Sequence, residues 1–260
     1  FSKAFDITFL DKDGKRQHAW QNTWAITTRE LGVMVAIHSD DRGLVLPPKI
    51  APIQAVIVPI FDDKSKSSVL KVAKKLESEL KGVRVHLDDR DYYTPGWKFN
   101  EWELKGVPVR IEIGPKDIKA KQAVLVRRDT LKKTPVALGK LAKQVDKELI
   151  DIQKNLFKKA SDFLASSTHK VKTYQEFKHT LEKKKGIIQT RWCMDVKCED
   201  RIKEETGAKI TNIPLNNKVS GEICTENYYS KVRSITTIHK LIEKFVEENL
   251  TVKRPGTGLP

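Results

Sequence analysis

Short apolar stretches alternate with longer segments of helical spacing along the middle of the chain. Val and Ile, which are typical of β-strands, dominate the short stretches. These stretches fall at residues 55–60, 83–87, 107–114 and 123–128. A helix is expected over about residues 65–81, between the first two strands. Strands interleaved with helices predict a mixed sheet that helices cover, and therefore an α/β domain.

The segment before the third strand is rich in aromatic and turn-forming residues. Pro95 and Gly96 predict a turn, and residues 97–105 predict a short helix. In the strand that follows, apolar side chains alternate with Arg110 and Glu112, which is typical of a half-buried strand. An exposed Trp/Phe cluster beside charged side chains can stack bases of single-stranded RNA and bond to their edges. The alternative is a small hydrophobic core with solvated charges.

The first part of the chain has a different pattern. Residues 4–28 alternate around a DKDG turn, which predicts a hairpin of an antiparallel sheet. Thr27 or Thr28 can cap a helix that follows. We expect the apolar residues of this helix to form its buried side; they are Leu31, Val33, Met34 and Ile37. A domain boundary is expected within residues 40–52, which include the Pro47-Pro48 pair.

The last part predicts one long helix and a small αβ unit. Apolar residues recur at helical spacing from Val136 to about Leu164, which describes an amphipathic helix. Residues 151–185 hold nine lysines against four acids, which indicates a solvated helix face or a track for an RNA backbone. The small unit is expected to contain strands at 186–190 and 208–215 and a helix near 198–206.

Charge and cysteine content narrow the functional classes. The 260-residue chain carries a formal net charge of +15, which favours an anionic partner such as nucleic acid. Three cysteines, an odd number, argue against a disulfide framework. The sequence contains no apolar run of membrane-spanning length and no signal peptide. We therefore expect a soluble, cytoplasmic protein that does not associate with membranes.

Two long blocks resemble one enzyme family. The block PGWKFNEWELKGVPVRIEIGPKD at 95–117 is similar to the signature of the anticodon-binding domain of prolyl-tRNA synthetase, in the archaeal and eukaryote-like form. The block from Trp24 to Ile60 resembles motif 3 of the same class II synthetases and the segment that follows it. Both blocks occur in family order.

The resemblance implies a domain plan of the α/β (α+β) class. Residues 1–50 would be a remnant of the antiparallel class II catalytic domain, and residues 51–150 the mixed-sheet anticodon-binding domain. Residues 151–227 would form a small αβ domain like the family's zinc-binding C-terminal domain. Residues 228–260 stay unassigned, although 247–258 resemble a short motif of the antifreeze-like domain of sialic acid synthases.

The resemblance also implies an activity. The complete enzyme is a homodimer that joins L-proline to tRNA(Pro) through prolyl-adenylate, with ATP and Mg²⁺ as substrates. On this resemblance, the chain would begin after motifs 1 and 2, so we expect it to be inactive alone. The alternative is a tRNA-binding module without catalysis.

Motif 3 supplies the candidate catalytic residues. By resemblance, Arg29 contacts the ATP phosphates, where its permanently charged fork offsets developing charge. Thr27 and Trp24 are expected to line the nucleotide and proline sites. The family usually has glycine where this chain has Ala25 and Ser39, and a side chain there can crowd a ligand or strain the backbone.

The anticodon-binding candidates also come from the resemblance. Phe99 would stack on a base, Glu103 and Asp117 would accept hydrogen bonds from guanine, and three cations would donate. These cations are Arg110, Lys116 and Lys132. The alternative for Glu103 is a charge pair along its own helix, and for Lys132 a flexible loop lysine.

Three cysteines have spacing like that of the family's zinc site. They are Cys193, Cys198 and Cys224, and the fourth family thiolate would fall at Asn227, a poor zinc ligand. We expect a degenerate, metal-poor site. The alternative is a weak site that His239 or a water completes.

Overall fold

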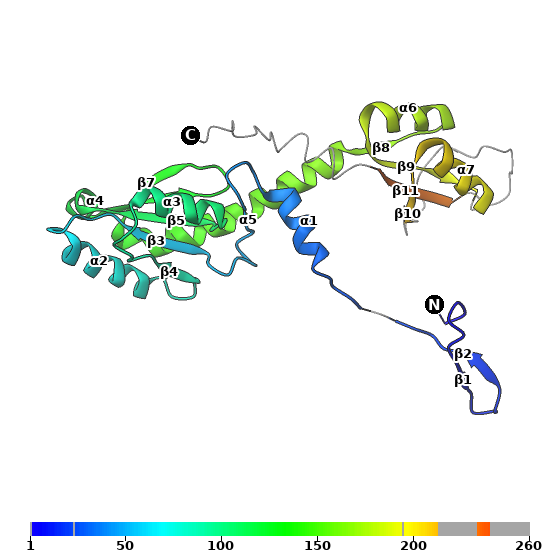
Figure 1. Ribbon diagram of the computed structural model, residues 1–260, viewed down its shortest axis with the longest axis horizontal. Coiled ribbons are helices and arrows are strands. Elements are labelled where there is room, and N and C mark those ends of the chain that lie inside the picture. The colour runs from blue at the N-terminus through cyan, green and yellow to red at the C-terminus, as the bar shows by residue number, and fades with distance from the viewer. Residues whose placement is uncertain (1, 23, 194, 213–232, 240–260) are drawn as a thin grey trace, which may run out of the picture. The chain divides into compact units, whose positions relative to one another are not determined.

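The computed structural model describes residues 2–22, 24–193, 195–212 and 233–239 (Figure 1). Its contacts divide the chain into two units, Phe1–Val33 and Met34–Pro260, which are described separately.

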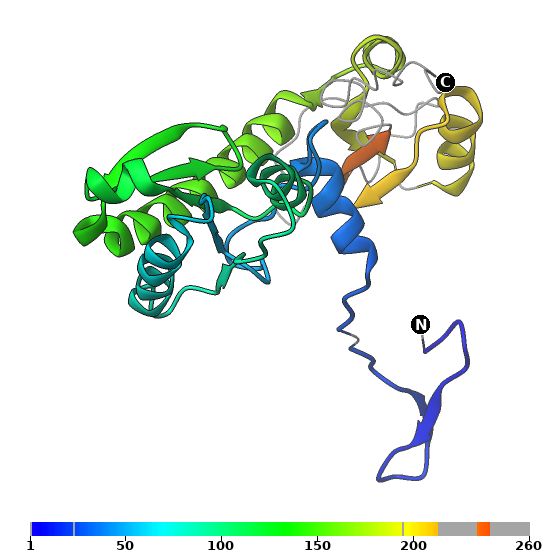
Figure 2. The ribbon, with the colours of Figure 1, turned by 60° about the vertical axis from the view of Figure 1, so that its left-hand side comes forward.

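The first unit contains a small hairpin. Strands β1 (Thr8–Leu10) and β2 (Arg16–His18), blue in Figure 2, pair antiparallel. Asp11 closes the turn between them, because its Oδ1 accepts hydrogen bonds from the backbone N–H groups of Asp13 and Lys15 at 3.0 and 2.9 Å. The predicted hairpin is thus present, although its strands are shorter than the pattern indicated.

Helix α1 (Arg29–His38) begins where the sequence predicts it. The expected buried side is wrong, because α1 has no buried residue. Leu31 is 59% exposed and Val33 is 39% exposed. Helical spacing shows that one side is apolar, but burial also needs a second element packed against that side. Met34 and Ile37, the other two residues of this side, are only partly buried.

The second unit contains a five-stranded mixed sheet in the order β4-β3-β5-β6-β7. The central strand pairs, β3–β4 and β3–β5, are parallel, while β5–β6 and β6–β7 are antiparallel. The strands are β3 (Ala55–Pro59), β4 (Val85–Leu87), β5 (Val109–Ile113), β6 (Gln122–Arg127) and β7 (Lys133–Ala137). The predicted mixed sheet is confirmed, with β7 as an additional edge strand.

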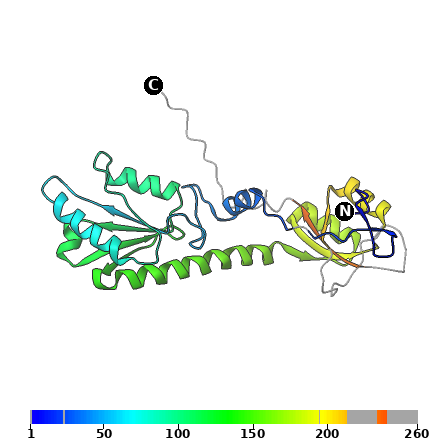
Figure 3. The ribbon, with the colours of Figure 1, turned by 90° about the horizontal axis from the view of Figure 1, so that it is seen from below.

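Helices cover both faces of this sheet, as Figure 3 shows. Helices α2 (Lys66–Glu79) and α5 (Leu141–Ser166) pack on the face that carries Ile57 and Ile111. Helix α3 (Pro95–Leu104) packs through Trp102 on the opposite face. Two short helical segments, α4 (Pro115–Lys119) and the 3₁₀ turn Leu138–Lys140, connect the remaining elements.

Two details of the predicted elements are corrected. All five residues of β5 are buried, so the expectation of a half-buried strand is wrong. The reason is that α3 covers the face that carries Arg110 and Glu112. The long helix begins at Leu141 rather than Val136, because residues 136 and 137 belong to β7.

A second sheet with the order β10-β11-β9-β8 lies in the C-terminal part. Its core contains Phe177, Ile188 and Trp192. The elements are β8 (Thr168–Lys170), α6 (Tyr174–Lys184), β9 (Gly186–Trp192), α7 (Val196–Thr206), β10 (Ile210–Asn212) and β11 (Arg233–His239). The stretch that the sequence left unassigned thus contributes β11, and the resembling segment 247–258 lies outside the described residues.

Among the described residues, no helix is both long and apolar enough to cross a membrane.

Asp88, directly after β4, anchors α3 to the sheet. Its carboxylate accepts two hydrogen bonds from Arg90 at 2.7 Å and one from Trp102 Nε1 at 2.8 Å. The buried Lys98 donates to the backbone oxygen of Asp88 at 3.1 Å. Burial alone would raise the pKa of Asp88, but these hydrogen bonds and the positive charges of Lys98 and Arg90 lower it to about 2.

We expect Asp88→Asn to destabilise the domain in a pH-dependent way. The ionised carboxylate stabilises the folded state fully above its unfolded pKa of 3.8, and this contribution disappears as the pH falls through about 2. At about pH 7, the charge-dependent part of the lost stability should be about 2 kcal/mol. Urea denaturation followed by tryptophan fluorescence should show the difference between unmodified and variant chains shrinking towards pH 2. A pH-independent difference would contradict this.

Candidate nucleic-acid interface

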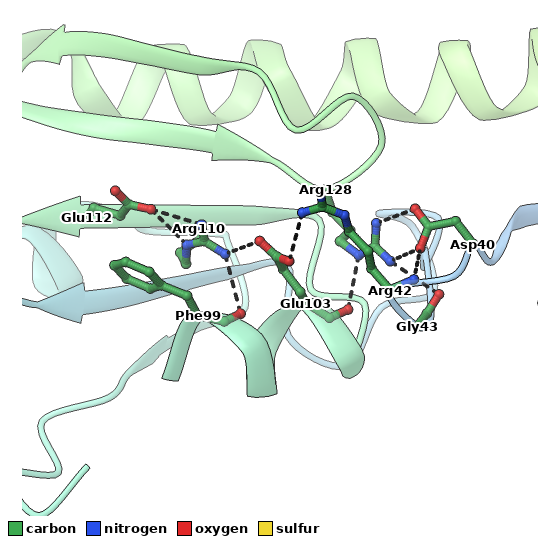
Figure 4. Close-up of polar contacts among 8 residues, drawn as sticks. All are labelled: Asp40, Arg42, Gly43, Phe99, Glu103, Arg110, Glu112 and Arg128. Carbon is green, nitrogen blue, oxygen red and sulfur yellow. Dashed lines mark hydrogen bonds and ion pairs between the residues drawn. The ribbon is translucent and has the colours of Figure 1, made fainter. Parts of the chain in front are cut away.

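Helix α3 begins at the predicted turn. Thr94 Oγ1 accepts a hydrogen bond from the backbone N–H of Trp97, and Pro95 occupies the first turn, where it needs no N–H partner. Pro95 and Gly96 are therefore the first residues of α3 rather than a separate turn. Phe99 and Glu103, one helical turn apart, lie on the side of α3 that faces Arg110 (Figure 4).

Arg110 on β5 is the centre of this site. Its side chain is only 7% exposed. Its Nε donates to Glu112 Oε1 at 3.0 Å, and its Nη1 donates to Glu103 Oε1 at 2.9 Å and to the backbone oxygen of Phe99 at 3.4 Å. Arg110 Nη2 also lies 2.9 Å from Glu112 Oε1. The guanidinium thus holds both carboxylates and one turn of α3.

Two exposed cations extend this cluster on either side. Arg42 Nη1 lies 3.6 Å from Glu103 Oε2, and Lys133 Nζ lies 3.5 Å from Glu112 Oε2. Both of these cationic side chains are 59% exposed. The result is a charge ladder of alternating sign, formed by Arg42, Glu103, Arg110, Glu112 and Lys133. Glu103, which is 18% exposed, is thus paired across elements rather than along its own helix.

The aromatic residues of this region are divided between two environments. The Phe99 ring is partly buried, with the Arg110 Cζ atom 4.3 Å from its centroid. Trp102 is buried, whereas Trp97 is 43% exposed and stacks on Tyr93 with ring centroids 3.7 Å apart. The expected exposed Trp/Phe cluster is therefore only partly present.

The other anticodon candidates lie on neighbouring turns. Asp117 Oδ2 accepts a hydrogen bond from the backbone N–H of Gly114 at 2.9 Å and so caps α4. Lys116, in the first turn of α4, is exposed. Lys132 is also exposed and precedes β7; its backbone oxygen accepts a hydrogen bond from Arg127.

Arg128 is a site residue that the sequence reasoning missed. Its side chain is 1% exposed and donates through Nη1 and Nη2 to the Asp40 carboxylate at 2.8 and 2.5 Å. Its Nε donates to the backbone oxygen of Glu103 at 3.0 Å. Burial alone would raise the pKa of Asp40, but the hydrogen bonds from Arg128 lower it below its ordinary value. The two arginines at the end of the predicted strand 123–128 were the available signal, but the partner of Arg128 lies 88 positions away.

The motif 3 candidates are exposed. Trp24 is 90% exposed, and Thr27 and Arg29 are exposed as well. Ala25 and Ser39 adopt no positive φ; among the described residues other than glycine, that conformation occurs at Asp6, Lys121, Leu131 and Lys185. The backbone strain that a side chain could cause at the two glycine positions is therefore absent. Ser39 lines a cavity of about 460 Å³ between the end of α1 and α5.

The cysteine candidates belong to the C-terminal part. Cys193 follows β9 and Cys198 is buried in α7, and both adjoin the same apolar core. Cys224 and Asn227 lie outside the described residues, as does the side chain of His239. Within the described residues, no group of three or more His, Cys, Asp or Glu side chains is arranged to hold a metal ion. Three cysteines and one asparagine, the residues at the four candidate positions, do not fit a closed four-ligand zinc site.

Comparisons with known proteins match two parts of the chain. Residues 54–148 match the family model described as "Anticodon binding domain", and residues 174–233 match the one described as "Prolyl-tRNA synthetase, C-terminal". Proteins called "Proline--tRNA ligase" are similar over most of the chain. The one from Natranaerobius thermophilus is 45% identical over 231 residues, covering 88% of this chain and 48% of the relative.

Two further relatives agree. The "Proline--tRNA ligase" of Alkaliphilus oremlandii is 48% identical over 225 residues, which cover 86% of this chain and 46% of the relative. The "Proline--tRNA ligase 2" of Clostridioides difficile is 48% identical over 226 residues, which cover 86% of this chain and 47% of the relative. The chain spans about half the length of these curated relatives.

We expect the purified chain to contain well under one zinc ion. The reason is that asparagine replaces the fourth thiolate at position 227, and a soft metal needs a complete set of soft ligands to bind tightly. Elemental analysis of the chain as isolated, after exchange into metal-free buffer, measures the metal content. Stoichiometric zinc that disappears in Cys193→Ser would show that another residue completes the site.

Proposed function

Because this chain belongs to the prolyl-tRNA synthetase family, we propose that it is the C-terminal portion of a proline–tRNA ligase and that it binds the anticodon arm of tRNA(Pro). The observation that carries this proposal is the Glu103 carboxylate, which Arg110 holds beside the Phe99 ring on one side of α3. A net charge of +15 adds a general attraction for RNA.

The chemistry of guanine fits this site. Proline anticodons end in two guanines, and each offers N–H donors on its Watson–Crick edge and two acceptors, O6 and N7. In this proposal, Glu103 and Asp117 accept from the N–H donors, while Lys116 and Lys132 donate to the acceptors. Phe99 supplies a stacking surface, with Arg110 covering part of the ring.

Arg110 has a different part in this proposal. Its Nε, Nη1 and Nη2 all have carboxylate or carbonyl partners. We therefore assign it the task of orienting Glu103 and Phe99. A planar fork holds two carboxylates in a fixed geometry, which the flexible point charge of a lysine does not impose.

The catalytic half of the proposal concerns the whole protein. Arg29 would contact the ATP phosphates, with Thr27 and Trp24 beside the nucleotide and proline. In the complete enzyme, the proline carboxylate would attack the α-phosphate of ATP and expel pyrophosphate, with Mg²⁺ required as a cofactor. The terminal hydroxyl of the tRNA would then attack the carbonyl carbon of prolyl-adenylate and expel AMP. A cytoplasmic homodimer is the corresponding proposal for location and assembly. The names of the relatives favour this ligase over a non-catalytic binding module.

We expect Glu103→Gln to reduce the preference for guanine. The amide loses the negative charge and replaces one acceptor with a donor, so binding of an RNA stem-loop with the proline anticodon should weaken by about 1–3 kcal/mol. A stem-loop with the guanines replaced should bind almost unchanged. Fluorescence titration of both RNAs measures the preference.

The matched control for this titration is a pair of exposed lysines on α5. Replacing Lys154 and Lys158 by alanine should weaken both RNAs alike and flatten the salt dependence, because phosphate contacts carry no sequence information. Equal binding of both RNAs by the unmodified chain would contradict anticodon readout.

We expect these 260 residues alone to give only background proline-dependent ATP–pyrophosphate exchange. Trp24, Thr27 and Arg29 are exposed, whereas adenylate formation needs an enclosed pocket that holds both substrates. The exchange assay should be run beside a relative of full length as positive control. A clear signal from this chain would overturn the view that it holds only part of the catalytic site.

A further inference from the structure

The segment after α1, residues 40–43, forms a tight turn beside Glu103, the residue proposed to bind guanine. The backbone N–H of Asp40 donates to the backbone oxygen of Gly43 at 3.1 Å, and the N–H of Gly43 donates to the oxygen of Asp40 at 3.0 Å. Asp40 Oδ1 also accepts from the backbone N–H of Arg42 at 3.0 Å. The turn therefore fixes the backbone of Arg42 from both sides.

Contacts with the end of α3 fix the position of this turn. Arg128 donates to the Asp40 carboxylate and also to the backbone oxygen of Gly43 at 3.2 Å. The backbone N–H of Leu44 donates to the oxygen of Leu104 at 3.0 Å. Gly43 has a φ of +126°, and a Cβ there would lie 2.6 Å from Leu104 Cα. Only glycine allows this close approach.

The locked turn presents one side chain to the site. Arg42 is 59% exposed, and its Nη1 lies 3.6 Å from Glu103 Oε2, on the carboxylate oxygen that Arg110 does not use (Figure 4). An exposed ion pair of this length contributes little to stability. Arg42 is therefore the cation of the charge ladder that borders Glu103 from the solvent side.

The edge of guanine has a matching order of groups. Its N1–H and N2 amino donors lie next to O6, and O6 lies next to N7. A carboxylate that accepts from N1 and N2 leaves O6 and N7 towards its neighbour. A guanidinium in that place can donate to both acceptors at once.

We infer that Arg42 is a specificity-determining residue of this site, which donates to O6 and N7 of the guanine whose N–H groups Glu103 accepts. The inference rests on the proposed function, because it concerns the same guanine. It assigns the reading of one base to two elements, α3 and the turn after α1. Asp40 and Arg128 position Arg42 without touching the RNA.

Modified bases test this assignment. Each titration uses a proline anticodon stem-loop that carries guanine, 7-deazaguanine or inosine at one of the two guanine positions. Four chains are compared: the unmodified chain, Arg42→Ala, Arg42→Lys and Glu103→Gln. The 7-deazaguanine base lacks the N7 acceptor, and inosine lacks the N2 amino group. Lys75→Ala on α2 is the matched control, because α2 packs on the face of the sheet opposite to α3. Lys75 is 73% exposed and pairs with Glu79 at 3.7 Å, so it also is an exposed cation in a long ion pair.

We expect Arg42→Ala to weaken binding of the guanine stem-loop roughly 5- to 100-fold. At one of the two positions, the penalty for 7-deazaguanine should disappear in this variant while the penalty for inosine persists. Glu103→Gln should show the reverse pattern. Arg42→Lys should recover only part of the affinity, because it lacks the fork. Lys75→Ala should behave like the unmodified chain.

Two results would overturn the inference, and they differ. If Arg42→Ala weakens every stem-loop alike and keeps the 7-deazaguanine penalty, Arg42 contacts phosphate rather than the base, and anticodon readout stands without it. If the unmodified chain shows no preference for guanine, the proposed function fails and takes this inference with it. Thermal denaturation of Arg42→Ala should give a midpoint near that of the unmodified chain, since the residue is exposed.

Discussion

The buried guanidinium of Arg110, held between Glu103 and Glu112, is the interaction on which the site depends. Removing a charge from water is costly, so such a group persists only where its partners are close and well aligned. Here, the carboxylate contacts are 2.9–3.0 Å long. Because one partner lies on β5 and the other on α3, the cluster fixes the position of α3 along the sheet.

Successive side chains of a strand point to opposite faces of the sheet, and this alternation places both the core residues and the site residues. Ile57 and Ile111 face the core under α2 and α5, whereas Val56 and Arg110 face α3. A second polar anchor, Asp88, holds α3 through Trp102 and Lys98, and its lowered pKa keeps it charged. The surface proposed to bind RNA is thus the uncovered margin of one helix that two buried ionic clusters fasten to the sheet.

Local patterns predicted the elements well but their burial poorly. The strands at 55–60 and 123–128 and the helix near 65–81 were confirmed because periodicity and residue preference are local properties. The full burial of β5 was not predictable, since it depends on α3 docking over Arg110. The prediction that the apolar side of α1 is buried was wrong for the opposite reason. An apolar stripe on a helix does not guarantee that a second element packs against it.

The candidate site was predictable only in part. Glu103 and Arg110 entered through resemblance to a family motif, and no rule of spacing would have paired them. Arg128 and Asp40 were missed because they are far apart in sequence and each is unremarkable alone. The turn at Gly43 was visible as a glycine, but the contact of this turn with Leu104 at the end of α3 appears only in three dimensions.

A double-mutant cycle on guanine discrimination tests most directly whether Arg110 acts by orienting Glu103. Arg110→Lys keeps the charge and loses the fork, and it is combined with Glu103→Gln. The discrimination between guanine and guanine-substituted stem-loops is then measured for all four chains. We predict that Arg110→Lys alone removes most of the discrimination and that adding Glu103→Gln costs little more. Fully additive losses would contradict the orienting role and indicate that Arg110 contacts the base independently.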